Sequence, residues 1–199
     1  KLPTMVKGNV TLGDFSSDGS IFSYSQSNPA HSTEIFTVSL NTGKIRQWTR
    51  SSQAGIDPAT FVQPKLIKFK SFDGKLIPAF LFLPKGAKPD HSVPTILSVH
   101  GGPESQEKPL FTPIYQYFLS RGYAVVAPNI RGSAGYGKNY LALDNGSLRW
   151  NALKDLNALV DHLSTQPELN PRKVAIFGGS YGGFAVLAMM AHYPDRFAA

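Results

Sequence analysis

A serine flanked by glycines is the residue of this chain best suited to covalent chemistry. It lies in the segment Gly178-Gly179-Ser180-Tyr181-Gly182-Gly183, between the apolar runs 174–177 and 184–191. A strand, a sharp turn and a helix in this order are typical of a nucleophile elbow, which lifts a serine hydroxyl out of a sheet. Small residues at 178, 179, 182 and 183 suit the crowded turn. We predict that Ser180 is a nucleophile; the alternative is a glycine-rich connection with an ordinary serine.

A second glycine-rich segment could supply the groups that stabilise an oxyanion. His100-Gly101-Gly102-Pro103 follows an apolar run at 95–99. In hydrolases with a nucleophile elbow, a loop at this place contributes one backbone N–H and the residue after the nucleophile contributes another. The N–H groups of Gly102 and Tyr181 are therefore the candidate donors to a tetrahedral intermediate. The alternative is a plain turn at a strand end.

The general base that a serine nucleophile needs is not evident in this chain. In this fold an Asp and then a His follow the nucleophile, and only 19 residues follow Ser180. His192 and Asp195 stand in the reverse order, and His192 would lie about 18 Å from Ser180 along a helix. The other candidates, His31, His91 and His162, are expected at the surface. We therefore expect the acid and the base to lie outside a chain that is truncated at both ends.

The elements that would position these residues alternate between strands and helices. Apolar runs predict strands at 66–70, 77–83, 95–99, 123–127 and 174–177. A helix at 150–163 places Trp150, Leu153, Leu156, Val160 and Leu163 on one face, with Lys154, Asp155 and Asp161 off it. This order predicts an α/β fold with a doubly wound, mostly parallel sheet, which is part of an α/β-hydrolase fold.

The first part of the chain has a different pattern. Short strands predicted at 21–25, 34–38 and 44–48 are separated by turns rich in Asp, Asn and Gly, which favours an antiparallel meander. The meander resembles one β-propeller blade, which cannot close a ring alone. A small self-contained sheet is the alternative. Since residues 51–63 suit a linker, we predict a blade-like segment at 1–59 and the N-terminal part of a catalytic domain at 60–199.

Composition restricts the possible partners. The chain has 199 residues and a formal charge of +7, but its Lys and Arg residues are scattered, so nucleic acid is not an expected partner. No apolar run reaches the roughly 18 to 20 residues of a membrane span, so no membrane is expected either. The lack of cysteine agrees with a reducing compartment, and we expect a cytoplasmic location.

Three segments together resemble the prolyl oligopeptidase family of serine peptidases, most of all its acylaminoacyl-peptidase and dipeptidyl-peptidase branch. They are His100-Gly101-Gly102-Pro103, Asn129-Ile130-Arg131-Gly132-Ser133-Ala134-Gly135-Tyr136-Gly137 and the segment around Ser180. The resemblance covers nearly the whole chain and matches Ser180, Tyr181 and Gly102 to functional positions. Some family members carry a Tyr at the position of His100, so the role of His100 stays open, with a structural one favoured. Arg131 is expected to be an ion-pair or hydrogen-bond anchor.

The resemblance implies a parent protein that hydrolyses oligopeptides without a metal or an organic cofactor. It also implies that the remaining C-terminal half of the hydrolase domain is a partner of this chain, which alone should be inactive. Two alternatives stay open. An elbow and an oxyanion loop also serve a carboxylesterase or lipase, and an idle serine would leave a non-catalytic binding fragment.

Overall fold

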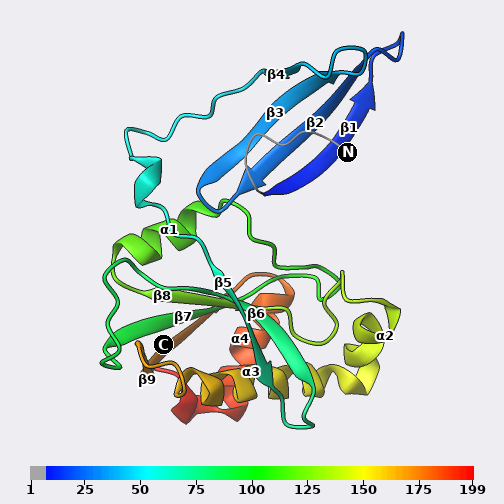
Figure 1. Ribbon diagram of the computed structural model, residues 1–199. Coiled ribbons are helices and arrows are strands. Elements are labelled where there is room, and N and C mark those ends of the chain that lie inside the picture. Colours follow the sequence, from blue (N-terminus) through cyan, green and yellow to red (C-terminus); the bar gives the residue numbers. More distant parts are fainter. Residues whose placement is uncertain (1–7) are drawn as a thin grey trace. The chain divides into compact units, whose positions relative to one another are not determined.

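The computed structural model describes residues 8–199, which divide into two units (Figure 1). The first unit comprises the residues up to Gln63 together with Pro109–Pro113, and the second comprises Pro64–Lys108 and Ile114–Ala199. The first unit contains one antiparallel sheet in the order β1-β2-β3-β4. Its strands are β1 (Asn9–Phe15), β2 (Ile21–Asn28), β3 (His31–Ser39) and β4 (Ile45–Gln47).

Alternating apolar residues build the small core of the first sheet. Tyr24 and Phe36 are paired across β2 and β3, and their rings stack with centroids 5.4 Å apart. The turn between β1 and β2 is closed by Asp18, whose carboxylate accepts hydrogen bonds from the hydroxyls of Ser16 and Ser20. These hydrogen bonds, that with Ser16 first, lower the pKa of Asp18 to about 2. The sequence predicted β2, β3 and β4, whereas β1 is an additional strand.

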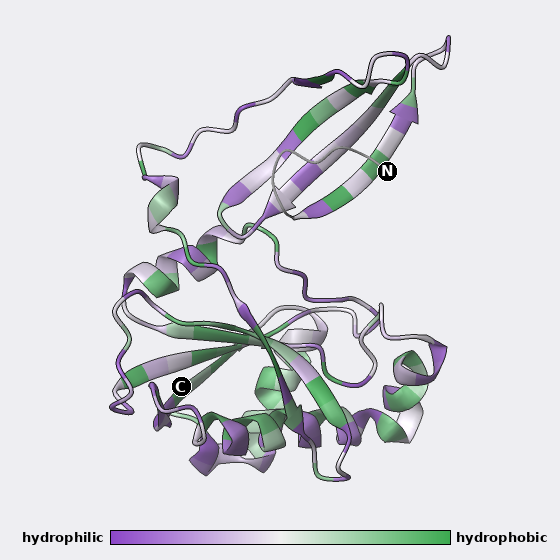
Figure 2. Ribbon diagram, in the orientation of Figure 1, coloured by the Kyte–Doolittle hydropathy of each residue, from purple (hydrophilic) through white to green (hydrophobic). Residues whose placement is uncertain are grey.

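The second unit is built on a mixed five-stranded sheet in the order β5-β6-β8-β7-β9. Its strands are β5 (Lys65–Lys70), β6 (Leu76–Phe82), β7 (Val93–Val99), β8 (Ala124–Pro128) and β9 (Leu169–Gly178). Strand β7 is parallel to both β8 and β9, while β6 is antiparallel to both β5 and β8. Figure 2 shows that the central strands are mostly apolar, as is typical of strands covered on both faces.

Helices cover both faces of this sheet. The α-helices are α1 (Pro113–Ser120), α2 (Lys138–Leu141), α3 (Arg149–Leu163) and α4 (Tyr181–His192). Short 3-10 turns are η1 (Pro58–Thr60) in the first unit and η2 (Ala142–Asp144), η3 (Gly146–Leu148) and η4 (Pro194–Arg196) in the second. Alternate residues of β7 face opposite layers: Leu97 belongs to the core shared with α3 and α4, and Ser98 bonds Tyr115 of α1.

Helix α3 covers the sheet as predicted, but its buried face is rotated. Leu153, Leu156, Val160 and Leu163 are buried, whereas Trp150 is 49% exposed. Asp155, which the pattern placed off the buried face, is fully buried. The hydrophobic pattern alone misplaced Asp155 because its carboxylate is buried by pairing with a cation from another part of the chain.

Helix α4 follows Ser180 directly and packs on β7 and β9. Its apolar residues are not all covered, since Leu187 is 73% exposed. After α4, the N–H of Ala198 donates to the Val174 carbonyl of β9. Within the described part of the chain, no helix combines the length and apolar character that crossing a membrane requires.

Candidate active site

Ser180 lies at the junction of β9 and α4 in a backbone conformation that few residues adopt. Its φ is 55° and its ψ is −120°, outside the regions favoured by L-residues. Ser180 occupies the N-cap position of α4, yet its side chain makes no capping hydrogen bond. The residue is exposed. A strained turn that presents an uncommitted hydroxyl at a helix N-terminus is the geometry of a nucleophile elbow.

Two of the four glycines around Ser180 are required by close backbone contacts. A Cβ at Gly182 would lie 2.1 Å from the Val99 carbonyl oxygen, and one at Gly178 would lie 2.7 Å from the Gly182 carbonyl carbon. Gly179 has nothing within 4 Å, and a Cβ at Gly183 would make an ordinary contact of 3.7 Å. The prediction that the geometry demands small residues is therefore correct for Gly178 and Gly182 and wrong for Gly179 and Gly183.

The loop after β7 lies directly beside Ser180. A Cβ at Gly101 would meet the Ser180 Cβ at 3.4 Å and its Oγ at 3.9 Å. Gly102 has a φ of 127°, and a Cβ there would lie 2.7 Å from the Glu104 nitrogen, so only glycine fits. The structure thus brings the glycine-rich loop and the predicted nucleophile together. Tyr181, the first residue of α4, has a backbone N–H without an intrahelical partner.

The His100 ring connects this loop to the loop after β8. One ring nitrogen, Nδ1, lies 2.7 Å from the Gly101 carbonyl oxygen, and Nε2 lies 2.9 Å from the Ser133 hydroxyl. Burial lowers the pKa of the imidazole, against the opposing effect of its bond to Gly101. The contact with backbone fits the structural role that the sequence favoured for His100.

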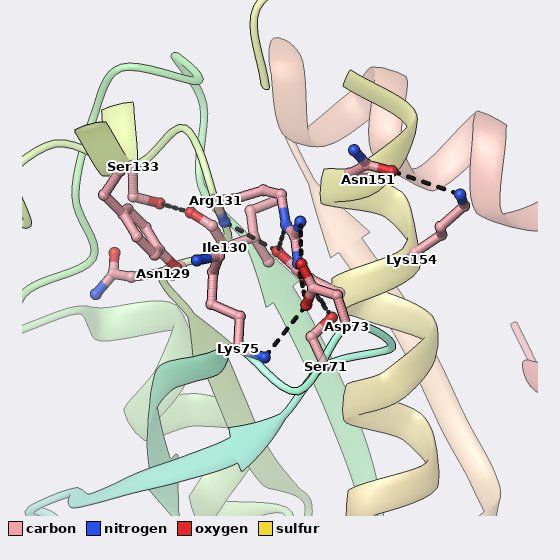
Figure 3. A network of polar contacts seen from close by, with 11 residues as sticks. Ser71, Asp73, Lys75, Asn129, Ile130, Arg131, Ser133, Asn151 and Lys154 are labelled. Atoms are coloured by element: carbon pink, nitrogen blue, oxygen red, sulfur yellow. Dashed lines mark hydrogen bonds and ion pairs between the residues drawn. The ribbon is translucent and has the colours of Figure 1, made fainter. Parts of the chain in front are cut away.

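Arg131 is the centre of a buried network that joins three segments (Figure 3). Its guanidinium donates through Nε and Nη2 to both carboxylate oxygens of Asp155, at 2.9 and 2.7 Å, and lies 3.1 Å from both oxygens of Asp73. Ser71 donates to Asp155 at 2.5 Å. Burial opposes the charge on Arg131, but the two carboxylates raise its pKa overall. Arg131 is thus placed as an anchor, as predicted, and does not contact Ser180.

The side chain of Tyr181 is buried, with its hydroxyl near the Asp144 carboxylate. Its hydroxyl and Oδ2 of Asp144 are both buried, and within residues 8–199 neither has a hydrogen bond of acceptable geometry. Burial first, and the neighbouring Asp144 carboxylate second, raise the pKa of Tyr181. Burial also raises the pKa of Asp144. Gly132 permits this packing, because a Cβ there would lie 2.5 Å from the Asp144 carboxyl carbon.

Glu107, four residues after the glycine-rich loop, carries a partly buried carboxyl group. Its Oε2 accepts a hydrogen bond of 3.3 Å from Tyr115, whose hydroxyl lies 2.8 Å from Ser98. Burial raises the pKa of Glu107 to about 7, and the bond from Tyr115 lowers it only in part. The sequence analysis did not single out Glu107 or Asp144, and it named Ser133 only as a member of the 129–137 segment, because their contacts form only in the fold.

No general base contacts the candidate nucleophile within residues 8–199. The His192 ring packs 4.9 Å from the Trp150 ring, and His162 is half-buried against Phe69 rather than fully exposed. His31 bonds Asn28 and His91 bonds the Leu169 carbonyl. The same residues contain no group of three or more His, Cys, Asp or Glu side chains that could hold a metal ion.

Comparison with known proteins identifies the class to which this fold and site belong. The sequence profile of the prolyl oligopeptidase family matches residues 109–199. A dipeptidyl aminopeptidase BIII from Pseudoxanthomonas mexicana is 37% identical over 138 residues, which are 66% of this chain and 20% of that protein. A solved prolyl endopeptidase superposes with a TM-score of 0.87 at 26% identity over 98% of this chain and 29% of its own.

The acylaminoacyl peptidase of Pyrococcus horikoshii superposes with a TM-score of 0.80 at 25% identity, over 96% of this chain and 30% of its own. These matches confirm the resemblance of this chain to the prolyl oligopeptidase family, whose profile matches residues 109–199. They also confirm the fold class, a partial α/β-hydrolase fold preceded by a propeller-blade-like antiparallel segment. The chain spans less than a third of each of these relatives.

Proposed function

We propose that the whole protein is a serine peptidase that hydrolyses short peptides through an acyl-enzyme on Ser180. The observation that carries the proposal is the strained, exposed and uncapped Ser180 directly beside Gly101. The relatives support the reaction class, since each of those named above is a peptidase. This chain would contribute a blade-like segment at 1–59 and the N-terminal part of the catalytic domain at 60–199.

In the proposed reaction, Ser180 Oγ attacks the scissile carbonyl carbon while its proton passes to a histidine base outside this chain. The backbone N–H groups of Gly102 and Tyr181 stabilise the negative oxygen of the tetrahedral intermediate. The C–N bond then breaks, the amine leaves with the proton, and water hydrolyses the ester on Ser180. Loss of one such oxyanion donor typically raises the barrier by about 3 kcal/mol.

The remaining C-terminal half of the hydrolase domain is the proposed partner of this chain, because it would carry the Asp and His of the triad. The 199-residue chain by itself should therefore hydrolyse peptides no faster than a Ser180→Ala variant. The cytoplasmic location and the absence of nucleic-acid and membrane partners stay predictions.

A fluorophosphonate probe tests the nucleophile directly. The folded whole protein should be labelled at Ser180, the Ser180→Ala variant should not, and Ser164→Ala serves as the control because Ser164 is an exposed serine at a helix end. A folded whole protein that fails to react would refute the assignment. Comparing aminoacyl amides with simple esters as substrates then separates a peptidase from a carboxylesterase or lipase.

A further inference from the structure

The segment 129–137 plays no part in the proposed mechanism, yet it is hydrogen-bonded to the loop that follows β7. The N–H of Ala134 donates to the Ser105 carbonyl oxygen at 2.7 Å. A Cβ at Gly135 would lie 2.7 Å from the Gln106 carboxamide, so the two segments approach closely there as well. Because β7 and β8 are parallel neighbours, the two loops leave the sheet at the same edge. One segment is therefore placed to hold the other.

The side chain of Asn129 makes the most complete contact between the two loops. Asn129 directly follows β8, is fully buried and points away from the Arg131 network (Figure 3). Its Oδ1 accepts a hydrogen bond of 2.7 Å from the Glu107 N–H, and its Nδ2 donates to the Glu107 carbonyl oxygen at 3.0 Å. Two residues of antiparallel strands exchange the same pair of bonds through their backbones. The carboxamide thus pairs with Glu107 as an additional strand would.

The donors and acceptors of this pair fix the orientation of the carboxamide. A backbone N–H can only donate and a carbonyl oxygen can only accept, so Oδ1 must face the N–H of Glu107 and Nδ2 its carbonyl. The second hydrogen of Nδ2 is directed to the Tyr136 hydroxyl oxygen, at 2.9 Å. Both side-chain polar atoms of Asn129 are therefore used, in roles that a carboxylate or an apolar group of the same size cannot fill together.

The backbone of Asn129 is anchored independently of the loop. Its N–H donates to the Pro78 carbonyl oxygen of β6 at 2.9 Å, and its carbonyl oxygen accepts from the Tyr140 hydroxyl at 2.7 Å. Residues 100–107 are therefore tied to the sheet at both ends, by their covalent connection to β7 and by Asn129. Gly102 lies between these ties, and its φ of 127° must be set by the surrounding loop, since glycine adopts φ angles of either sign about equally.

We propose that Asn129 is a positioning residue, which holds residues 101–107 in the conformation that sets the proposed oxyanion donor Gly102 next to Ser180. Without the two bonds to Glu107, the far end of the loop would lose its direct tie to the end of β8, and Gly102 would sample other conformations. The catalytic part of this inference rests on the proposed function, whereas the pairing of Asn129 with Glu107 does not.

Hydrogen–deuterium exchange of the whole protein, resolved to single amides by mass spectrometry, tests the pairing. In the unaltered protein, the Glu107 amide should exchange at least about tenfold more slowly than in an unstructured peptide of the same sequence. In Asn129→Leu, which keeps the side-chain size and removes both bonds, this amide should exchange about tenfold faster, while the amides of β7 stay as protected as before. An unprotected Glu107 amide in the unaltered protein would overturn the proposal, and so would unchanged protection in Asn129→Leu.

Asn129→Asp tests the same pairing through its pH dependence, because it keeps the shape of the side chain. An ionised carboxylate has no hydrogen to donate, so it would face the Glu107 carbonyl oxygen as a second acceptor. A protonated carboxyl group has one O–H, which would restore this bond. Asn170→Asp is the matched control: Oδ1 of Asn170 accepts a bond from the Arg172 N–H at 3.0 Å, a role that a carboxylate also fills.

In the whole protein, Asn129→Asp should lower kcat for peptides about tenfold near pH 8 at a nearly unchanged KM, since only the transition state uses the oxyanion donors. The ratio of its kcat to that of the unaltered protein should recover as the pH falls and the new carboxyl group takes up a proton. Both proteins carry Glu107 and the same histidines, so their titration does not affect this ratio. Asn170→Asp should keep the kcat of the unaltered protein at every pH.

Two results would overturn the positioning role: a raised KM at constant kcat in Asn129→Asp, or a lowered kcat ratio that does not change with pH. Either result leaves the proposed function intact as long as fluorophosphonate labels Ser180. If the probe does not label Ser180 but the Glu107 amide is protected as expected, the proposed function fails and the pairing of Asn129 with Glu107 stands.

Discussion

Replacement of Gly182 by alanine is the sharpest test of the close approach of helix α4 to strand β7. The new Cβ would lie 2.1 Å from the Val99 carbonyl oxygen and 3.1 Å from its carbon. Both atoms are backbone atoms of β7, so no rotamer change can relieve the contact. Helix α4 and strand β7 would have to move apart by about 1 Å to reach ordinary separation.

The expected cost follows from two opposing effects. Inserting a methyl group into a packed interior costs about 1–3 kcal/mol, and alanine regains at most about 1 kcal/mol over glycine in a helix. Gly182→Ala should therefore lower the free energy of unfolding by roughly 1–2 kcal/mol. Gly183→Ala, whose Cβ would make only a 3.7 Å contact, should be neutral or raise it by up to about 1 kcal/mol.

Urea unfolding followed by Trp150 fluorescence measures both variants. A Trp48→Phe background leaves Trp150 as the one tryptophan, and its ring packs on His192 at the end of α4. Both variants replace a glycine of α4 by alanine at neighbouring positions. They therefore differ mainly in how close the new Cβ lies to β7. If Gly182→Ala proves as stable as Gly183→Ala, the close approach of α4 to β7 is wrong.

Two further predictions concern the carboxyl groups of Asp155 and Glu107. Asp155→Ala should lower the free energy of unfolding by about 3–5 kcal/mol, because Arg131 would stay buried without its main partner; a loss below about 1 kcal/mol in urea unfolding would contradict this. Glu107, with its pKa raised from 4.5 to about 7, keeps a proton in the folded chain that the unfolded chain releases across this range. Its contribution to stability should therefore fall as pH rises between those values, by at most about 3 kcal/mol. Glu107→Gln should remove this pH dependence of the free energy of unfolding. An equally steep pH dependence in the variant would show that it does not come from Glu107.

Much of the second unit could be predicted because its signals are local. Short apolar runs located β5 to β8 to within two residues, whereas β9 begins five residues earlier than predicted; the glycine pattern located the turn that holds Ser180. The placement of the glycine-rich loop beside the elbow followed from the loop that hydrolases with a nucleophile elbow carry after the corresponding strand. These features depend on side-chain size and spacing, which are readable along the chain.

Features that depend on distant partners could not be predicted in the same way. Asp155 was expected off the buried face of α3 because the guanidinium that neutralises it comes from residue 131. Trp150 was expected on that face, yet it is half-exposed and meets His192 instead. The contact of Ser133 with His100 joins residues 33 positions apart, which no local pattern reveals.

The hydrogen-bond network around Arg131 also has consequences for the folding and unfolding rates of the chain. Ser71 and Asp155 are 84 positions apart, and Arg131 and Asp73 are 58 apart, so these bonds can close only after the intervening strands have assembled. Interactions that form after the rate-limiting barrier slow unfolding and leave the folding rate nearly unchanged. We therefore expect the buried ion pairs to lengthen the lifetime of the folded second unit without speeding its formation, which unfolding and refolding rates of Asp155→Ala would test.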